Sequence, residues 1–386
     1  MLRWPYVTAQ QLKGFDRYKY SAVDTNPLSV YVMQHLWNRI VKIVPLWIAP
    51  NLLTFSGFLL ILINYLILCH YDWDYSASGS GRIPNWVWWF AALSTFCAYT
   101  LDSIDGKHAR RTQSCTPLGE LFDHGLDSWA TSLFILSWFS ACASPEGTPG
   151  VSVHTMYLSL IIVLFNFMFS HWEKYNTGVL FLPWGYDLSQ VALVAAYVLT
   201  ASVGVEIWYR PLVFGYYITA VLMTLIIGCS IFLSLPQTLH NIHMAYMKKT
   251  LKKDSLYESL LPLVSPAILF LLLTAWVALS PCDILIKQPR LFLWMVGVAF
   301  SNVTCRVIIC QMSNTRSEPF HWLLFPLAAV VFAAITGLLG RLEESILTVL
   351  TVLATAAHVH YGLCVGRQLS QHFNIYTFSM KKPAQE

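Results

Sequence analysis

Charged residues are scarce in this sequence of 386 residues: Asp, Glu, Lys and Arg make up 11% of it, and hydrophobic residues 56%. Soluble domains carry roughly 25% charged residues, so this composition excludes an ordinary water-soluble protein. The net charge of +4 is small, and the sequence has no basic tract that would predict a nucleic-acid partner. A mean hydropathy of +0.54 instead indicates a polytopic membrane protein.

Cysteine pairs and processing signals are also missing. The nine cysteines are scattered and form no C-x-x-C pair, so neither a disulfide framework nor a zinc site is predicted. Residues Met1–Asp24 lack the apolar core of a cleavable signal peptide, and we expect the membrane helices themselves to provide targeting. Because no internal repeat is visible, we expect one membrane domain, residues 49–366, between a cytosolic N-terminal segment, 1–48, and a cytosolic tail, 367–386.

Apolar runs long enough to cross a bilayer are abundant. Each run of about 17 or more apolar residues predicts one membrane helix. The predicted fold is an all-α polytopic membrane protein with about ten transmembrane helices. The predicted spans are Asn51–His70, Trp86–Leu101, Leu121–Ala143, Val151–Ser170, Leu188–Trp208, Leu212–Leu235, Leu260–Leu279, Leu291–Met312, Trp322–Leu339 and Ser345–Gly366.

A more polar stretch precedes the first span. Asn26-Pro27 predicts a helix N-cap followed by proline at the first helical position, and apolar residues then recur at intervals of three and four. Because basic and polar side chains occupy the other faces, we expect an interfacial amphipathic helix over Leu28–Val44 that lies on the membrane. Pro45 ends this helix.

The basic residues predict the orientation. Of the 24 Lys and Arg, 18 fall in the N-terminal segment, the tail and the loops after even-numbered spans; five fall in the other loops, and Arg306 lies within the eighth span. Cytoplasmic loops carry the excess of Lys and Arg. Both termini, and the stretch between the second and third spans, are therefore predicted to face the cytosol.

Four aspartates stand where the second predicted span ends and the third begins: Asp102 and Asp105, then Asp123 and Asp127. Spacings of three and four place each pair of carboxylates on one face of a helix. Helix-end charges that snorkel to the interface are the alternative, but snorkelling favours Lys and Arg. Facing aspartate pairs predict a site for two hard divalent cations, Mg²⁺ or Mn²⁺, of the kind that supports phosphoryl transfer.

The stretch D-x2-D-G-x2-A-R-x8-G-x3-D-x3-D, which ends at Asp127, resembles the signature of the CDP-alcohol phosphotransferases at every fixed position, Gly119 included. The resemblance implies an enzyme that uses the four aspartates as metal ligands. The small residues Gly106 and Ala109 would let a diphosphate approach the backbone, with helix packing as the alternative. Arg110 and Lys107 could hold phosphate oxygens, with positive-inside anchoring as the alternative for Lys107.

If the aspartates bind metal ions, the acceptor hydroxyl needs another base. His124 follows Asp123, and Glu120 lies one helical turn before it, where it could orient the imidazole. Family members that make choline and ethanolamine lipids look similar here, which implies the same role for His124. The alternative is that Asp127 is the base and His124 only packs.

Two further stretches resemble family elements. Pro50-Asn51-Leu-Leu-Thr54 is similar to a P-N-x-x-T element near the nucleotide, which implies that Asn51 contacts cytidine. The stretch His171–Gly178, which we expect to be a loop, is similar to a W-E-x-Y-x-T-G stretch of eukaryotic members. Glu173 would then shape the head-group pocket; a plain loop charge is the alternative.

Within the family, the sequence most resembles the ethanolaminephosphotransferase, or selenoprotein I, branch over essentially the whole chain. The residues that carry this resemblance include Lys19–Asp24, Gly119–Asp127 and Ser170–Asp187. After the Leu182–Gly185 turn the chain reads Tyr-Asp-Leu-Ser, where choline-using relatives tend to carry a G-P-x-E-G-like element. Selenium-containing members continue through a selenocysteine, whereas this chain stops at Glu386.

The implied reaction, a step of phospholipid biosynthesis, transfers phosphoethanolamine from CDP-ethanolamine to diacylglycerol or an alkyl-acylglycerol, giving phosphatidylethanolamine and CMP. The resemblance also implies a homodimer among the lipids of the endoplasmic reticulum or Golgi membrane, with its active site facing the cytosol. A choline-using or dual choline/ethanolamine phosphotransferase is one alternative, and a secondary transporter is another. A transporter should show paired broken helices or an inverted repeat, and the sequence shows neither.

Overall fold

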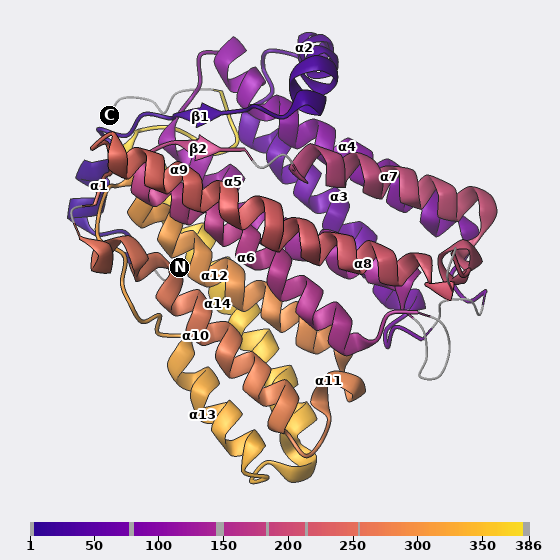
Figure 1. Cartoon of the computed structure of the whole chain (residues 1–386). Helices are drawn as coiled ribbons and strands as arrows, with labels where there is room; N and C mark the ends of the chain where they lie inside the picture. Colours follow the sequence, from indigo (N-terminus) through magenta and orange to yellow (C-terminus); the bar gives the residue numbers. More distant parts are fainter. Residues whose placement is uncertain are drawn as a thin grey trace.

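The computed structural model of the chain describes residues 4–76, 81–143, 150–182, 185–212, 215–253 and 255–380. Most of these residues are helical, as the apolar runs predict (Figure 1). The α-helices are α1 (Ala9–Phe15), α2 (Gln34–Ile43), α3 (Pro50–Tyr71), α4 (Asn85–Arg111), α5 (Pro117–Cys142), α6 (Val153–Thr177), α7 (Gly185–Val203), α8 (Ile218–Cys229), α9 (Leu235–Met247), α10 (Leu256–Leu279), α11 (Ile284–Lys287), α12 (Pro289–Met312), α13 (Leu324–Ile335) and α14 (Glu343–His372).

Seven helical segments in the described part of the chain are long and apolar enough to cross a membrane: α3, α6, α7, the continuous segment Ile218–Met247, α10, α12 and the segment Gly340–His372. The protein is therefore a multi-pass, all-α membrane protein. The other three predicted spans coincide with α4, α5 and α13. Of these, α4 and α5 carry the aspartates at their adjoining ends, and α13 has only 12 residues.

Several predicted span ends differ from the helix ends; α4, for instance, continues past Leu101 to Arg111. Local structure explains two further differences. The sixth span was expected to end at Leu235, but a π-helical turn over Ser230–Ser234 leads directly into α9, which continues to Met247. The π-helical turn shifts the backbone pairing just before Pro236, so the missing N–H of this proline does not stop the helix. The expected loop after Ser170 is also helical, because α6 continues to Thr177 and ends at Gly178, whose φ of 78° suits glycine.

The stretch expected to form an interfacial helix is helical. It consists of a π-helical turn, Ser29–Met33, and α2, which lies across the end of α4 (Figure 1). Trp37 packs edge-on against Tyr99 of α4, and Arg111 donates hydrogen bonds of 2.7 Å to the carbonyls of Val41 and Val44. These bonds satisfy carbonyls that the end of α2 leaves unpaired.

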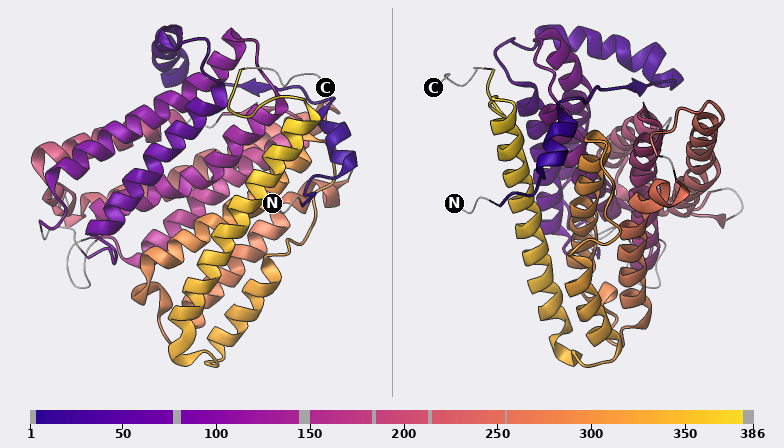
Figure 2. Two further views of the ribbon diagram at one scale, coloured as in Figure 1. Left: turned by 180° about the vertical axis from the view of Figure 1, so that it is seen from behind. Right: turned by 90° about the vertical axis from the view of Figure 1, so that its left-hand side faces the viewer.

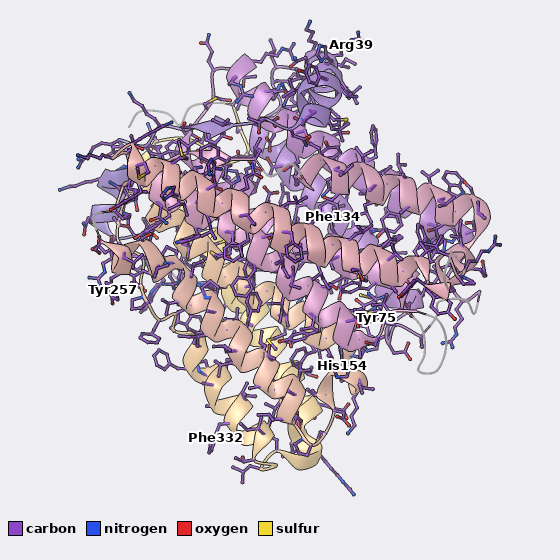
Figure 3. All side chains as sticks on the ribbon, viewed as in Figure 1. Arg39, Tyr75, Phe134, His154, Tyr257 and Phe332 are labelled. Atoms are coloured by element: carbon purple, nitrogen blue, oxygen red, sulfur yellow. The ribbon has the colours of Figure 1, made fainter. Side chains whose placement is uncertain are left out.

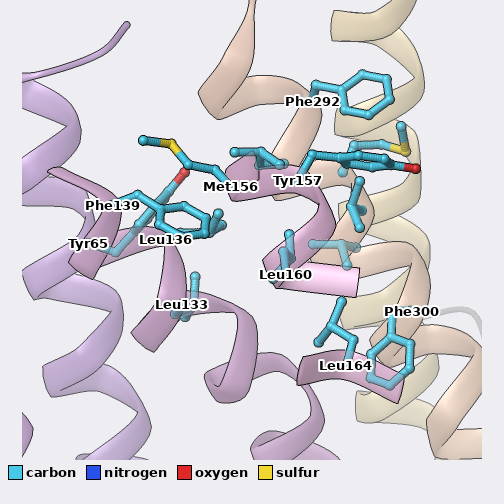
Figure 4. Close-up of a cluster of buried hydrophobic side chains, with 14 of the residues drawn as sticks. Tyr65, Leu133, Leu136, Phe139, Met156, Tyr157, Leu160, Leu164, Phe292 and Phe300 are labelled. Carbon is cyan, nitrogen blue, oxygen red and sulfur yellow. The ribbon is translucent and has the colours of Figure 1, made fainter. Parts of the chain in front are cut away.

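Helix α12 lies at the centre of the bundle. In its most apolar 18 residues 89% of positions are buried, against 17–50% in the other candidate spans. Side chains such as Leu133 of α5, Leu160 of α6 and Phe300 of α12 form the core between these helices (Figure 4). By contrast, outward side chains such as Tyr257 and Phe332 are 60% and 62% exposed, as expected for a lipid-facing surface (Figure 3).

The N-terminal segment crosses the end of the bundle at which α4 and α5 meet. Strands β1 (Ala22–Val23) and β2 (Leu180–Phe181) pair in parallel and attach this segment to the end of α6. The backbone N–H groups of Tyr6 and Val7 donate to Gln368 Oε1 of α14 at 2.9 and 3.1 Å. Figure 2 accordingly shows the indigo N-terminal segment beside yellow α14.

Candidate active site

A tight turn over residues 112–116 joins α4 to α5. Gln113 adopts a left-handed φ of 54°, and the Thr116 hydroxyl caps α5 by accepting a hydrogen bond of 3.1 Å from the Gly119 N–H. Pro117 then occupies the first turn of α5. This local sequence folds the chain back on itself, so the last turns of α4 face the first turns of α5.

The four predicted metal ligands come together at this point. Carboxylate oxygens of Asp102, Asp105 and Asp123 lie within 4.8 Å of one another, and so do ligand atoms of Asp123, His124 and Asp127. In the described chain, the ion pairs of these aspartates involve only His124, at 4.0 Å from Asp123 and 3.8 Å from Asp127. Carboxylates this close repel one another without a cation, and their oxygens suit hard ions. The cluster therefore fits a divalent metal ion.

Two neighbours that the sequence did not assign to this cluster hold its carboxylates. The Thr54 hydroxyl of α3 donates to Asp105, and the Tyr186 hydroxyl of α7 donates to Asp102 at 2.7 Å. Hydrogen bonds of this kind orient ligands before an ion binds. Both residues stood in stretches singled out for the nucleotide or the head group, but no sequence pattern indicated that they would reach the aspartates.

Glu120 is held mainly by residues other than His124. It accepts hydrogen bonds of 2.5 Å from both Lys174 and Tyr18. Burial and this carboxylate raise the pKa of the Tyr18 hydroxyl well above its ordinary value, so Tyr18 remains a donor. His124 Nε2 lies 3.8 Å from Glu120 Oε1, which is too long for a hydrogen bond. The predicted pair is thus adjacent, with Glu120 fixed by Lys174 and Tyr18.

The His124 side chain is enclosed. Its Nε2 is buried and has no hydrogen-bond partner among the described residues. The ring of His171 packs against it edge-on, with centroids 5.4 Å apart, and His171 Nδ1 lies 3.0 Å from Gln311 Oε1 of α12. His171 and Gln311 were not among the predicted site residues. His171 did stand beside the Trp-Glu stretch, whereas nothing in the sequence connected Gln311 to the site.

The predicted cytidine contact, Asn51, lies at the start of α3 beside the C-terminal tail. Its side-chain amide donates to the Thr377 carbonyl at 2.9 Å, and Phe378 packs against Phe55. A Cβ at Gly119 would lie 3.3 Å from Asn51 Oδ1, so the bare backbone of Gly119 allows this close approach. Asn51 and Gly119 are therefore neighbours at the rim of the aspartate site.

The two basic residues predicted to hold phosphate differ in their surroundings. Lys107 donates to Asn38, in the middle of α2, at 2.8 Å, which favours anchoring. Arg110 is exposed, and its side chain makes no hydrogen bond or ion pair with the described residues. A Cβ at Gly106 would meet only Arg110 Nη1, at 3.8 Å, so the backbone there is accessible. Ala109, which precedes Arg110 in the sequence, is half-buried.

The predicted head-group residues make structural contacts. Glu173, 3% exposed, accepts from Asn241 of α9 at 2.6 Å, so it is a buried helix residue and no loop charge. Asp187 accepts from Asn26 at 3.1 Å and from Tyr99. Within the Leu182–Gly185 turn, residues 183 and 184 lie outside the described residues.

A cleft of about 360 Å³ opens between α3, α4 and α5. Asp102, Asp127 and Tyr186 line it together with apolar side chains such as Phe58 and Phe134. The cluster of carboxylates therefore adjoins a cleft that has an apolar side.

Comparison with known proteins identifies the class. Residues 47–247 match the family model described as CDP-alcohol phosphatidyltransferase. The chain is 53% identical to Ethanolaminephosphotransferase 1 of Mus musculus over 386 residues, and 53% identical to that of Homo sapiens over 385; each match covers 99% of this chain and 96% of the relative. It is 28% identical to Choline/ethanolaminephosphotransferase 2 of Arabidopsis thaliana over 396 residues, which cover 98% of this chain and 99% of the relative.

The protein is therefore a membrane-embedded transferase. It belongs to the CDP-alcohol phosphatidyltransferase family, and the resemblance inferred from its aspartate spacing is confirmed.

Proposed function

We propose that this protein transfers phosphoethanolamine from CDP-ethanolamine to diacylglycerol or an alkyl-acylglycerol, giving phosphatidylethanolamine and CMP. The observation that carries the proposal is the convergence of Asp102, Asp105, Asp123 and Asp127 from two helix ends. This arrangement suits two divalent cations, Mg²⁺ or Mn²⁺, with Asp123 shared between the two groups of ligands. When bound, such ions would neutralise charge on the diphosphate and on the departing CMP.

In this reaction the acceptor oxygen bonds to the β-phosphorus, and the bond between that phosphorus and the oxygen bridging to CMP breaks. His124 Nε2 takes the hydroxyl proton, because it is buried and has no other partner in the described chain. The imidazolium that forms faces Glu120 on one side and Asp127 on the other. Arg110, Gly106 and the neighbouring Ala109 hold the diphosphate close to the backbone of α4.

The cleft beside the aspartates supports a lipid acceptor. Phe58 and Phe134 line it in the apolar part, and Asp102 and Asp127 line it at the chemical centre. A diacylglycerol can place its acyl chains against the former and its hydroxyl near the latter, while the nucleotide enters from water past Asn51 and Gly119. The charge distribution favours a cytosolic position for this opening, in endoplasmic reticulum or Golgi membranes, and we propose a homodimer.

The choice of ethanolamine is supported by the 53% identity to proteins named Ethanolaminephosphotransferase 1. The 28% identity to Choline/ethanolaminephosphotransferase 2 keeps a dual-specificity enzyme as the second candidate. A primary ammonium donates hydrogen bonds to carboxylates, whereas trimethylammonium prefers aromatic faces. Asp187 and Tyr186, at the start of α7, and Glu173 are the groups that would distinguish them.

The test is a competition assay with purified protein, diacylglycerol, and CDP-ethanolamine and CDP-choline at equal concentrations, in Mg²⁺, in Mn²⁺ and in chelator. We expect phosphatidylethanolamine and CMP in equal amounts, dependence on the metal ion, and at least tenfold preference for CDP-ethanolamine, equivalent to about 1.4 kcal/mol. Equal use of both nucleotides would support the dual-specificity candidate. Failure to use either one would contradict the proposed function.

A further inference from the structure

A second cavity lies apart from the aspartates and is lined by residues of the N-terminal segment, α10, α12 and α14. It encloses about 580 Å³ of space between atoms, part of it open to solvent. Tyr6, Arg306, His321 and Tyr361 are among the residues that line it, and none of the four aspartates does. Nothing in the proposed reaction uses this cavity.

Arg306 brings an unpaired positive charge to the cavity. It stands on α12, the most buried helix of the bundle, and its buried Nε has no hydrogen-bond partner in the described chain. No described carboxylate lies within 4.0 Å of it. The rings of Tyr361 and Tyr6 lie 5.1 and 5.8 Å from the guanidinium. Cation–π attraction offsets part of the cost of partly burying this charge but leaves Nε without an acceptor.

His321 adds a second unused donor. Its Nδ1 accepts a hydrogen bond of 3.1 Å from the Leu323 N–H, so the proton of the neutral ring is on Nε2. Burial, with a contribution from Arg306, lowers the pKa of His321 to about 3, and the ring is neutral at physiological pH. Nε2 is buried and without a partner among the described residues. Two N–H donors thus line one cavity without an acceptor.

Buried donors are nearly always paired in folded proteins, and a ligand that accepts hydrogen bonds and carries negative charge would satisfy both of these donors at once. A phosphate fits best, because the planar guanidinium can bind two of its oxygens at once. The neutral Nε2–H of His321 can donate to a third oxygen.

The rim of the cavity indicates a lipid with a cationic group. Glu318 is exposed and lines the same cavity, so a purely anionic ligand would meet a like charge. Phe320, which also lines it, is 58% exposed, and the adjacent Trp322 is 47% exposed. Exposed aromatic side chains gather at the membrane–water interface, which is the depth of phospholipid head groups.

We propose that this cavity is a second lipid site that binds the zwitterionic head group of a phosphatidylethanolamine. Its phosphate lies against Arg306 and His321, and its ammonium donates to Glu318. The proposal goes beyond the transferase reaction and does not rest on it, because the bound lipid can be any phosphatidylethanolamine of the membrane.

The test measures thermal unfolding of the full-length, delipidated protein in detergent, titrated with dihexanoyl-phosphatidylethanolamine, because a ligand of the folded state raises Tm. We expect Arg306→Met to weaken binding at least tenfold and Arg306→Lys to weaken it less. Lysine keeps the positive charge but cannot make the paired hydrogen bonds of a planar guanidinium. The matched control is Arg316→Met, an exposed arginine whose guanidinium lies 5.3 Å from the Tyr257 ring, and it should bind like wild type. Removing an unpaired charge should leave the Tm of unliganded Arg306→Met unchanged or higher.

Two further arms define the ligand. Dihexanoyl-phosphatidylcholine should bind more weakly than the ethanolamine lipid to wild type, and Glu318→Gln should remove this difference, because trimethylammonium has no N–H to donate. Undiminished binding by Arg306→Met would place the lipid elsewhere, such as at the aspartate site, and would overturn the proposal. Protection by inorganic phosphate equal to that by the lipid, or equal binding of both lipids to wild type, would also overturn it.

Discussion

In the proposed reaction, the two ring nitrogens of His124 face different carboxylates. Nδ1 lies 3.8 Å from Asp127, while the unpartnered Nε2 lies 3.8 Å from Glu120. Lys174 holds Glu120 at 2.5 Å, and both members of this pair are largely buried. A buried ion pair is costly to break, so the Glu120 carboxylate is held in place beside the His124 ring.

We therefore predict that His124→Ala loses activity by roughly 10²–10⁴-fold, the usual contribution of a general base, while Mn²⁺ affinity persists. Glu120→Gln should lose less, because Lys174 and Tyr18 still hold the side chain. Turnover and Mn²⁺ binding of the purified variants are the measurements. If Asp127 is the base instead, His124→Ala should be nearly normal and Asp127→Asn severely impaired with metal still bound.

The four aspartates could be predicted from the sequence because spacings of three and four fix one face of a helix before any tertiary contact forms. Their partners could not. Thr54, Tyr186 and Gln311 reach the site from other helices, and only packing determines which of their faces turns inward. For the same reason the sequence could not show that Lys107, predicted as a possible phosphate ligand from its place in the motif, contacts Asn38.

Close packing of α12 against α5 holds the start of α5, and hence half of the site. Gly297 makes this possible, since a Cβ there would lie 2.4 Å from Ser132 Oγ and 2.7 Å from its Cβ. Hydropathy predicts that both helices exist, but not where they touch. It also missed the passage from α8 to α9, because the π-helical turn before Pro236 accommodates a residue that normally stops a helix.

We predict that Gly297→Ala lowers the free energy of unfolding by about 1–3 kcal/mol through overpacking, measured as Tm in detergent. The matched control is Gly228→Ala in α8, where a Cβ meets nothing within 4 Å; alanine there should be neutral or stabilising by up to about 1 kcal/mol. Ser132→Gly should restore stability to Gly297→Ala. A Gly297→Ala protein as stable as wild type would refute the close contact.

The two ends of the chain lie on one side of the whole bundle. Tyr6 and Val7 bind Gln368 near the end of α14, and Thr377 reaches Asn51 beside the aspartates. The basic residues alone predict the same side for both termini, because the insertion machinery responds to their asymmetry. The N-terminal segment also brings Tyr18 against Glu120. The sequence could not predict this contact, because it depends on single hydrogen bonds between residues far apart in the chain.

We predict that tags at the N-terminus and at the C-terminus are both cleaved by protease added outside sealed microsomes, as the 18-to-5 distribution of basic residues requires. A tag placed in the loop around Arg82, on the opposite side in this arrangement, should be protected and serves as the control. Protection of either terminal tag would refute the predicted orientation.

The central claim, that the aspartate cluster catalyses attack of a lipid hydroxyl on the β-phosphorus, is tested most directly by following that phosphorus. Purified protein is given diacylglycerol, Mn²⁺ and CDP-ethanolamine labelled with ³²P at the β-position. We predict that the label passes to phosphatidylethanolamine while CMP is released unlabelled, and that Asp123→Asn, which keeps the side-chain shape but loses a ligand charge, retains less than about a tenth of this transfer. Label in CMP, label in water-soluble phosphoethanolamine, or full transfer by Asp123→Asn would contradict the account.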